Sequence, residues 1–153
     1  MHVERILCPV DFSPSSDRAL QMAIALARQF GAAIHLIHSF PVHADAFSAY
    51  GPALRDDVVQ QYRASASGRL SRLREEVASQ GIPTTARVSA VDPSLAIADE
   101  ARAEEVDLIV MGTRGLTGLK HIALGSVAER TLRIAPCPVM TVGEDKSEGE
   151  SRH

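Results

Sequence analysis

Four residues near the C-terminal end of the chain have the types and the spacing of a phosphate-binding loop. Gly112 and Gly115 are followed, after nine further residues, by Gly125 and Ser126. Glycines permit backbone angles that other residues avoid, and they let an anion approach the backbone amides closely. The motif ends where a helix is predicted to begin, and a helix N-terminus offers unpaired N–H donors. These residues indicate a site for nucleotide phosphates, although taken alone they also fit an ordinary loop between a strand and a helix.

Three side chains around the motif have an ordinary structural interpretation beside the ligand-binding one. Ser126 and Glu129 match the S-x-x-E capping box, so the Ser126 hydroxyl could cap the helix instead of binding phosphate. Arg114 could pair with phosphate oxygens or be a solvated loop charge. Asp11 could bond ribose hydroxyls, hold Mg²⁺ through water, or accept bonds from nearby backbone N–H groups.

Apolar periodicity predicts alternating strands and helices. Ser13-Pro14 and Asp92-Pro93 are typical helix starts, and Gly31 and Gly81 are typical helix ends. Strands are predicted over 3–10, 32–40, 84–91, 106–111 and 138–142, and helices over 14–30, 54–80, from 93 onward, and over 127–134.

This alternation predicts the fold class α/β: a single-domain, open, parallel five-stranded sheet with helices on both faces. The domain is expected to span 1–143, and the acidic tail 144–153 is expected to be disordered. In such sheets, ligands bind at the carboxyl ends of the strands, where the strand order reverses. With the order 3-2-1-4-5, that point lies between the first and fourth strands. Asp11 and Gly112 would then share one crevice.

Composition excludes several classes of protein. The chain has 153 residues, 45% of them hydrophobic and 23% charged, as in a globular domain. The net charge of −3 and the lack of a basic face argue against nucleic acid as a partner. No apolar run is long enough to span a membrane, so no membrane partner and a cytoplasmic location are expected. Cys8 and Cys137 lie far apart and are interpreted as small buried hydrophobes.

Several enzyme and signalling motifs are missing from the sequence. It contains no P-loop, no G-x-G-x-x-G after the first strand and no G-x-S-x-G elbow. A phosphoacceptor receiver domain would use Asp11, Asp92 and Thr113. It would also need a second acidic residue beside Asp11 and a lysine after the fifth strand, and both are missing.

Three segments together resemble the universal stress protein family over residues 3–142. They are Val10-Asp11-Phe12-Ser13, the glycine motif that follows Met111, and the closing Ala135-Pro136-Cys137-Pro138-Val139. The spacing of the glycine motif is that of the family's ATP-binding branch. The resemblance implies a flavodoxin-like (Rossmann-like) fold, a homodimer, and bound ATP with Mg²⁺ or Mn²⁺.

The resemblance also implies roles for individual residues. The backbone at Gly112 and Gly115 would meet the ribose and phosphates, and Gly125, Ser126 and Val127 would hold the outer phosphates. The adenine and ribose side would be lined by Pro9, Val10, Asp11 and Ser39, with Met111 nearby. No residue is assigned to catalysis or to direct metal ligation, so the ion would be held through the phosphates.

The function expected from these features is nucleotide sensing or regulation in a stress response. A slow ATPase or phosphotransferase is an alternative, and a nucleotide-free dimeric scaffold is a further one. The segment 138–142 is expected to be an edge strand, and an exposed edge invites pairing with a second copy of the chain.

Overall fold

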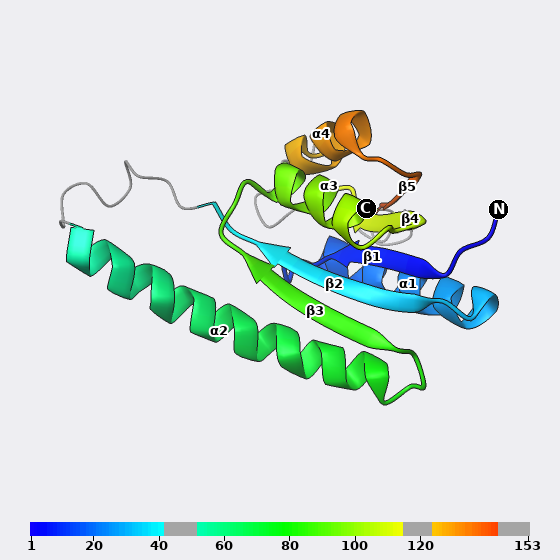
Figure 1. Ribbon diagram of the computed structural model, residues 1–153, viewed down its shortest axis with the longest axis horizontal. Helices are drawn as coiled ribbons and strands as arrows, with labels where there is room; N and C mark the ends of the chain where they lie inside the picture. Colours follow the sequence, from blue (N-terminus) through cyan, green and yellow to red (C-terminus); the bar gives the residue numbers. More distant parts are fainter. Residues whose placement is uncertain (42–51, 115–123, 144–153) are drawn as a thin grey trace, which may run out of the picture.

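The computed structural model describes residues 1–41, 52–114 and 124–143, in which strands and helices alternate along the chain (Figure 1). The strands are β1 (Arg5–Pro9), β2 (Ala33–Ser39), β3 (Thr84–Ser89), β4 (Leu108–Gly112) and β5 (Val139–Val142). The helices are α1 (Pro14–Phe30), α2 (Pro52–Ala78), α3 (Pro93–Ala103) and α4 (Ser126–Ile134). Each element lies where the periodicity predicts it, with its ends shifted by at most two residues.

The five strands form one parallel sheet in the order β3-β2-β1-β4-β5, which confirms the predicted topology. Ile6 in the central strand β1 pairs with Ile34 of β2 on one side and Leu108 of β4 on the other. The chain adds β2 and β3 on one side of β1, then crosses over to add β4 and β5. The reversal of strand order therefore lies between β1 and β4, as expected.

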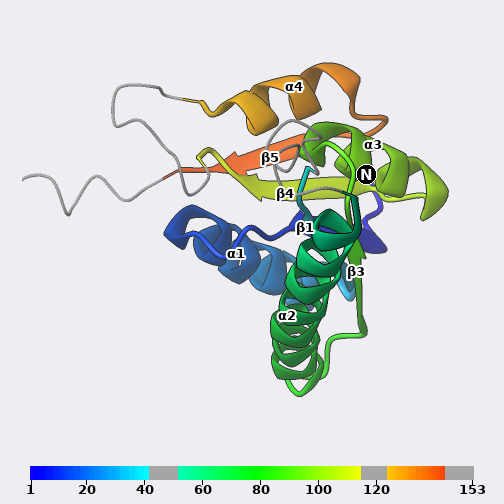
Figure 2. The same cartoon turned by 90° about the vertical axis from the view of Figure 1, so that its left-hand side faces the viewer.

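Helices cover both faces of the sheet, with α1 and α2 on one face and α3 and α4 on the other (Figure 2). Ile6 and Cys8 of β1 pack into the core under α1 and α2, whereas Leu7 packs under α3 and α4. Successive strand residues point to opposite faces, so a strand covered on both sides must be apolar throughout. These three side chains are fully buried.

The outer strand β3 is covered on only one face. Ala86 and Val88 pack against the core on the α2 side, while the alternate residues Thr85 and Arg87 are exposed. Helix α2 itself buries a few apolar residues, among them Leu70 and Val77. Among the described segments, no helix has both the length and the apolar character to cross a membrane.

The starts of α1 and α3 confirm the predicted helix caps. The Ser13 hydroxyl accepts a hydrogen bond from the Ser16 N–H, and the Asp92 carboxylate accepts from the Ser94 and Leu95 N–H groups. Helix α1 ends at Gly31, whose φ of 69° is open to glycine but strained for most other residues.

Candidate functional site

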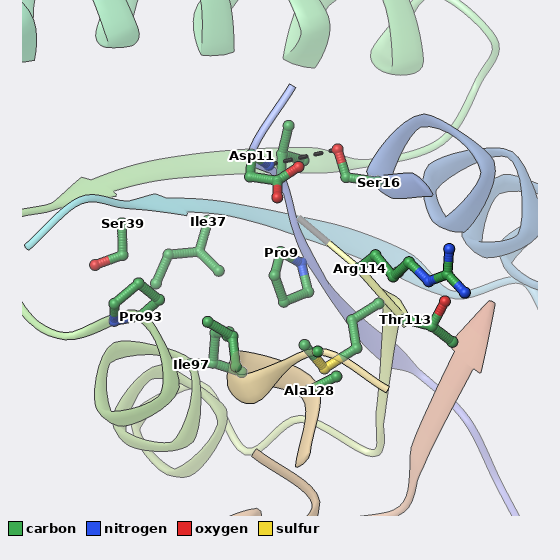
Figure 3. Close-up of a pocket in the computed structure, with 15 residues that line it drawn as sticks. Pro9, Asp11, Ser16, Ile37, Ser39, Pro93, Ile97, Thr113, Arg114 and Ala128 are labelled. Carbon is green, nitrogen blue, oxygen red and sulfur yellow. Dashed lines mark hydrogen bonds between the residues drawn. The ribbon is translucent and has the colours of Figure 1, made fainter. Parts of the chain in front are cut away.

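A crevice lies at the carboxyl ends of β1 and β4, where the strand order reverses (Figure 3). It is framed by the ends of β1, β2 and β4 and by the first turns of α1, α3 and α4. The residues that line it are Pro9, Val10, Asp11, Ser16, Ile37, Ser39, Pro93, Ile97, Met111, Gly112, Thr113, Arg114, Gly125, Val127 and Ala128. Parallel strands bring segments that are distant in the sequence to this one edge.

Most residues expected at a ligand site do line this crevice. They are Pro9, Val10, Asp11, Ser39, Met111, Gly112, Arg114, Gly125 and Val127. Ser126 lies between two of them as the exposed first residue of α4, and its side chain does not line the crevice. Gly115 lies outside the described residues, as do Lys120 and His121 of the same loop.

Asp11 belongs to a tight turn that joins β1 to α1. Its Oδ1 accepts a hydrogen bond from the Ser13 N–H at 2.9 Å, and its own N–H donates to the Ser16 hydroxyl at 3.4 Å. Phe12 between them has a φ of 62°, in the left-handed region that side chains rarely adopt. The turn uses one carboxylate oxygen of Asp11. The structural and ligand-binding interpretations of this residue are therefore compatible.

Gly112 is a glycine because β4 ends against the first turn of α1. A Cβ at this position would lie 2.4 Å from the Ser15 Oγ and 2.9 Å from the Ser15 carbonyl carbon. The second atom belongs to the backbone and cannot turn away. The protein's own packing thus requires a glycine here, a reason that the sequence pattern does not reveal.

Gly125 links the two ends of the glycine motif through a backbone hydrogen bond. Its N–H donates to the Thr113 carbonyl at 2.6 Å, and the Thr113 N–H donates to the Val142 carbonyl at 3.1 Å. A Cβ on Gly125 would lie 3.0 Å from the same Thr113 oxygen, so a larger residue would push these segments apart. The start of α4 is therefore held directly beside the end of β4.

Helix α4 begins without a side-chain cap. Gly125 is its N-cap residue, with extended backbone angles, and within the segments that the structure describes no side chain makes a capping hydrogen bond. The alternative in which Ser126 caps this helix is wrong, because Ser126 is already the first helical residue and the chain turns one residue earlier. The N–H groups of the first turn, at Ser126, Val127 and Ala128, have no partner within the helix.

The neighbouring helix α3 differs in this respect. Hydrogen bonding to Ser94 is the largest effect that lowers the pKa of the Asp92 carboxyl below its ordinary value, with the Leu95 N–H and the nearby Arg130 contributing. The Arg130 guanidinium lies 3.4 Å from Asp92 Oδ2, so it joins the second turn of α4 to the N-cap of α3. Asp92 thus holds a negative charge directly on its own helix terminus.

Two polar side chains brace the carboxyl ends of the strands. The Ser39 hydroxyl donates to the Val91 carbonyl, which ties the end of β2 to the segment before α3. His38 Nδ1 lies 2.7 Å from the Val10 carbonyl, and His38 Nε2 lies 3.3 Å from the Tyr62 hydroxyl of α2. His35 and His38 are three residues apart on β2 and point to opposite faces of the sheet, His35 toward Glu100 of α3 and His38 toward Tyr62 of α2.

Sequence reasoning missed six lining residues: Ser16, Ile37, Pro93, Ile97, Thr113 and Ala128. A signal existed for some of them. Ile37 lies two residues before Ser39 on the same face of β2, and Pro93 opens the helix that follows β3. Alternation along a strand and the shared edge of parallel strands would have placed both near the site.

The charged side chains among the described lining residues are Asp11 and Arg114. One carboxylate is too few to hold Mg²⁺ or Mn²⁺ firmly, since these ions bind through several oxygens and keep waters. A polyphosphate would supply the other oxygens, so this side-chain set fits an ion that is bound through a nucleotide.

Neither cysteine contributes a reactive group. Complete burial raises the pKa of the Cys8 thiol to about 12, and burial also raises the pKa of the half-buried Cys137. The thiolate is the reactive form, so both thiols are unreactive near neutral pH.

The fold and the crevice define an open, parallel α/β domain with its binding site at the topological switch point. The sequence matches the model of the universal stress protein family over residues 2–143. The chain belongs to the universal stress protein family. A universal stress protein of Methanocaldococcus jannaschii, MJ0531, is 33% identical over 147 residues, which cover 95% of this chain and 85% of that protein.

Solved structures share the fold. That of MJ0577 from the same organism superposes with a TM-score of 0.85 at 25% identity, over 95% of this chain and 99% of that one. A universal stress protein from Archaeoglobus fulgidus, solved in complex with dAMP, gives a TM-score of 0.64 at 23% identity, over 93% and 99%. Another, in complex with cAMP, gives 0.69 at 21% identity, over 93% and 98%.

Proposed function

We propose that this protein binds ATP in the crevice and acts as a nucleotide-sensing or regulatory module of the stress response. The observation that carries the proposal is the uncapped N-terminus of α4, which Gly125 holds beside the end of β4 at the switch point. Unpaired N–H groups at a helix N-terminus form an anion site. The nucleotides bound by two proteins of similar fold support the same interpretation.

The two parts of the crevice suit the two parts of a nucleotide. Its floor is apolar, formed by Pro9, Ile37, Ile97 and Met111, and would hold the adenine. Asp11 and Ser39, at the ends of β1 and β2, would meet the ribose, with Val10 beside them. Because the Ser39 hydroxyl already donates to Val91, it would act as an acceptor toward the sugar.

The phosphates would lie along the glycine motif. The phosphates next to the ribose would contact the backbone at Gly112 and Gly115. The outer phosphates would bind at Gly125, Ser126 and Val127, at the N–H groups of the first turn of α4. Arg114 would add a charge-assisted contact. Mg²⁺ or Mn²⁺ would be held through the phosphate oxygens, with Asp11 within reach of the ion through water.

A regulatory role is favoured over an enzymatic one by the charges at the site. Asp11 carries the one carboxylate among the described lining residues. In the proposed arrangement it would meet the ribose rather than the phosphates at the α4 terminus. Phosphoryl transfer to water uses a group that orients or activates the nucleophile. Hydrolysis by this protein, if measured, should be slow.

The experiment is titration of the full chain with Mg-ATP by calorimetry, with thermal unfolding in parallel. We expect saturable binding and a higher Tm, since a ligand of the folded state stabilises it. Gly125→Val should abolish both effects while the variant stays folded. Gly68→Ala is the matched control, because a Cβ at Gly68 on α2 meets open space. No binding at millimolar Mg-ATP, or unchanged binding by Gly125→Val, would contradict the proposal.

We also propose that two copies pair through β5. This strand is at the edge of the sheet, and Met140 on it and Leu132 on the adjacent α4 are exposed apolar side chains. Light scattering should give twice the mass of one chain, and Met140→Glu should give a monomer. A wild-type monomer at micromolar concentration would exclude this interface. The cytoplasmic location stays a prediction from the sequence.

A further inference from the structure

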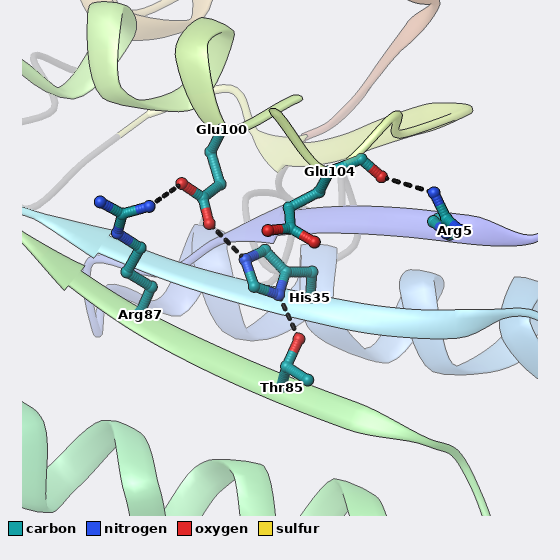
Figure 4. Close-up of polar contacts among 6 residues, drawn as sticks. All are labelled: Arg5, His35, Thr85, Arg87, Glu100 and Glu104. Carbon is teal, nitrogen blue, oxygen red and sulfur yellow. Dashed lines mark hydrogen bonds and ion pairs between the residues drawn. The ribbon is translucent and has the colours of Figure 1, made fainter. Parts of the chain in front are cut away.

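A second cluster of titratable side chains lies away from the crevice, between β2 and α3 (Figure 4). It consists of His35, Glu100 and Glu104. His35 is near the start of β2, whereas Ser39 at the end of the same strand lines the crevice. The function proposed above does not use this cluster.

The ligand atoms of the three side chains converge on one point. His35 Nε2 lies 2.6 Å from Glu100 Oε1, and one nitrogen or oxygen atom from each of the three residues lies within 4.8 Å of the others. Glu104 is the C-cap residue of α3, and its N–H donates to the Glu100 carbonyl at 2.9 Å, so the two glutamates lie one turn apart on the same side of the helix. The side chains of His35 and Glu100 are 14% and 6% exposed, while Glu104 is at the surface.

Further groups hold these side chains in place. His35 Nδ1 bonds the Thr85 hydroxyl of β3, which orients the imidazole with Nε2 toward the glutamates. The Arg87 guanidinium bonds the other Glu100 oxygen at 2.8 Å. The Arg5 guanidinium bonds the Glu104 backbone carbonyl at 2.9 Å. A histidine fixed through its second nitrogen and a carboxylate fixed through its second oxygen are the usual support of a metal ligand.

We propose that His35, Glu100 and Glu104 bind a divalent transition-metal ion, with zinc as the best match. A neutral imidazole and carboxylates together suit zinc, whereas Mg²⁺ and Ca²⁺ take oxygen ligands. Zinc takes the place of the hydrogen bond between His35 Nε2 and Glu100 Oε1. The imidazole stays neutral, with its one proton on Nδ1, donated to the Thr85 hydroxyl oxygen. Water completes the coordination on the open side, where β3 has no covering helix.

The geometry needs only a small adjustment. Ligand atoms around tetrahedral zinc are about 3.3 Å apart, given bonds of about 2.0–2.2 Å. His35 and Glu100 must therefore separate slightly, and Glu104 must close toward them. The exposed Glu104 side chain has the freedom to move, and the exposed positions of Thr85 and Arg87 show that the cluster can be reached from solvent.

The charge balance also favours a cation. Glu100 and Glu104 carry two negative charges. Among the described Lys and Arg residues, the one that bonds either carboxylate is Arg87, whose side chain is 62% exposed. Without a metal, the hydrogen bond from His35 to Glu100 satisfies the buried carboxylate. The cluster is therefore folded in both states, and zinc replaces this hydrogen bond rather than building the site.

The test is titration of the full chain, free of nucleotide, with Zn²⁺ in competition with a chromophoric chelator. We expect one tight equivalent in the wild type and no such equivalent for Mg²⁺. Glu104→Gln should weaken the binding at least about tenfold, and His35→Gln should remove it. Because Glu104 is exposed, its variant is expected to fold even if the His35 variant does not.

The matched control is His2→Gln, which removes the exposed pair formed by His2 and Glu4 and should leave the tight equivalent unchanged. A crystal grown with zinc should show anomalous density between His35 Nε2 and the two carboxylates. Absence of a tight equivalent in the wild type would overturn the proposal, as would its persistence in Glu104→Gln. Mg-ATP binding by Glu104→Gln should match the wild type, so this result is independent of the nucleotide site.

Discussion

Helices α3 and α4 begin at the same edge of the sheet, yet their N-termini are completed in different ways. Asp92 caps α3 and accepts two backbone N–H bonds, whereas α4 starts at Gly125 with no side-chain cap. Helix α1, at the same edge, is capped by Ser13. Each side-chain cap stabilises its helix by about 1 kcal/mol. Helix α4 lacks that contribution, and residues 1–41, 52–114 and 124–143 supply no side-chain acceptor for its first-turn N–H groups.

This difference shows how a binding site can arise from a part of the fold that is left incomplete. The three helices follow from the same βαβ architecture, and the first turns of all three line the crevice. In α1 and α3, a side-chain cap accepts hydrogen bonds from first-turn N–H groups. The third has no such cap among the described residues, so its first-turn donors suit an external acceptor.

The largest expected effect is on stability, at the contact between Gly112 and the first turn of α1. Gly112→Val should lower the free energy of unfolding by about 3 kcal/mol, because its Cβ would collide with the Ser15 backbone. Urea denaturation measures this loss. Gly68→Ala is the control, and it should instead stabilise α2 by about 1 kcal/mol. A Gly112→Val variant as stable as the wild type would mean that the first turn of α1 can shift away from β4 at little cost.

A substitution at Gly125 can give α4 a side-chain cap of the kind that Asp92 gives α3. Gly125→Asp supplies a capping carboxylate, which would occupy the first-turn N–H groups and repel phosphate. Mg-ATP affinity measured by calorimetry should fall at least about tenfold, or about 1.4 kcal/mol. Gly125→Ala adds the same Cβ without the charge and should lose less. Equal losses in the two variants would assign the effect to steric crowding against Thr113.

A smaller effect is expected when the side-chain cap of α3 is removed. Asp92→Ala should cost about 1 kcal/mol of stability at neutral pH, while Asp92→Asn, which keeps a capping oxygen, should cost less. The folded-state pKa of Asp92 is lowered, so the stabilisation by its charge is present above the unfolded pKa. That part is lost as the pH falls through the folded value. Thermal unfolding from pH 7 to pH 3 should show the difference between wild type and Asp92→Ala shrinking, and a growing difference would contradict this sign.

The smallest effect is expected for the ion pair between Asp92 and Arg130, which joins α3 to α4. Asp92 and Arg130 are 43% and 53% exposed, and an ion pair in water contributes little. A double-mutant cycle with Asp92→Ala and Arg130→Ala should give a coupling energy of about 0.5 kcal/mol. A coupling several times larger would mean that α3 and α4 are joined mainly through this pair.

Local sequence signals predicted the caps at Ser13 and Asp92 because such caps depend on a few consecutive residues. The predicted start of α4 is one residue too late, because Gly125 and Ser126 are both acceptable N-cap residues. The backbone turns at Gly125, where Thr113 approaches to hydrogen-bond distance. That contact joins residues from two different elements, so no local pattern could reveal it.

The sequence by itself determined the alternation of elements, the parallel sheet with its switch point, and most residues of the crevice. Hydrophobic periodicity and helix signals are local, and the carboxyl ends of parallel strands must meet at one edge. Only the tertiary structure decided why Gly112 must be glycine, which helix terminus is open, and that His35 meets Glu100 and Glu104. Those properties depend on distances between segments far apart in the chain, and packing alone sets such distances.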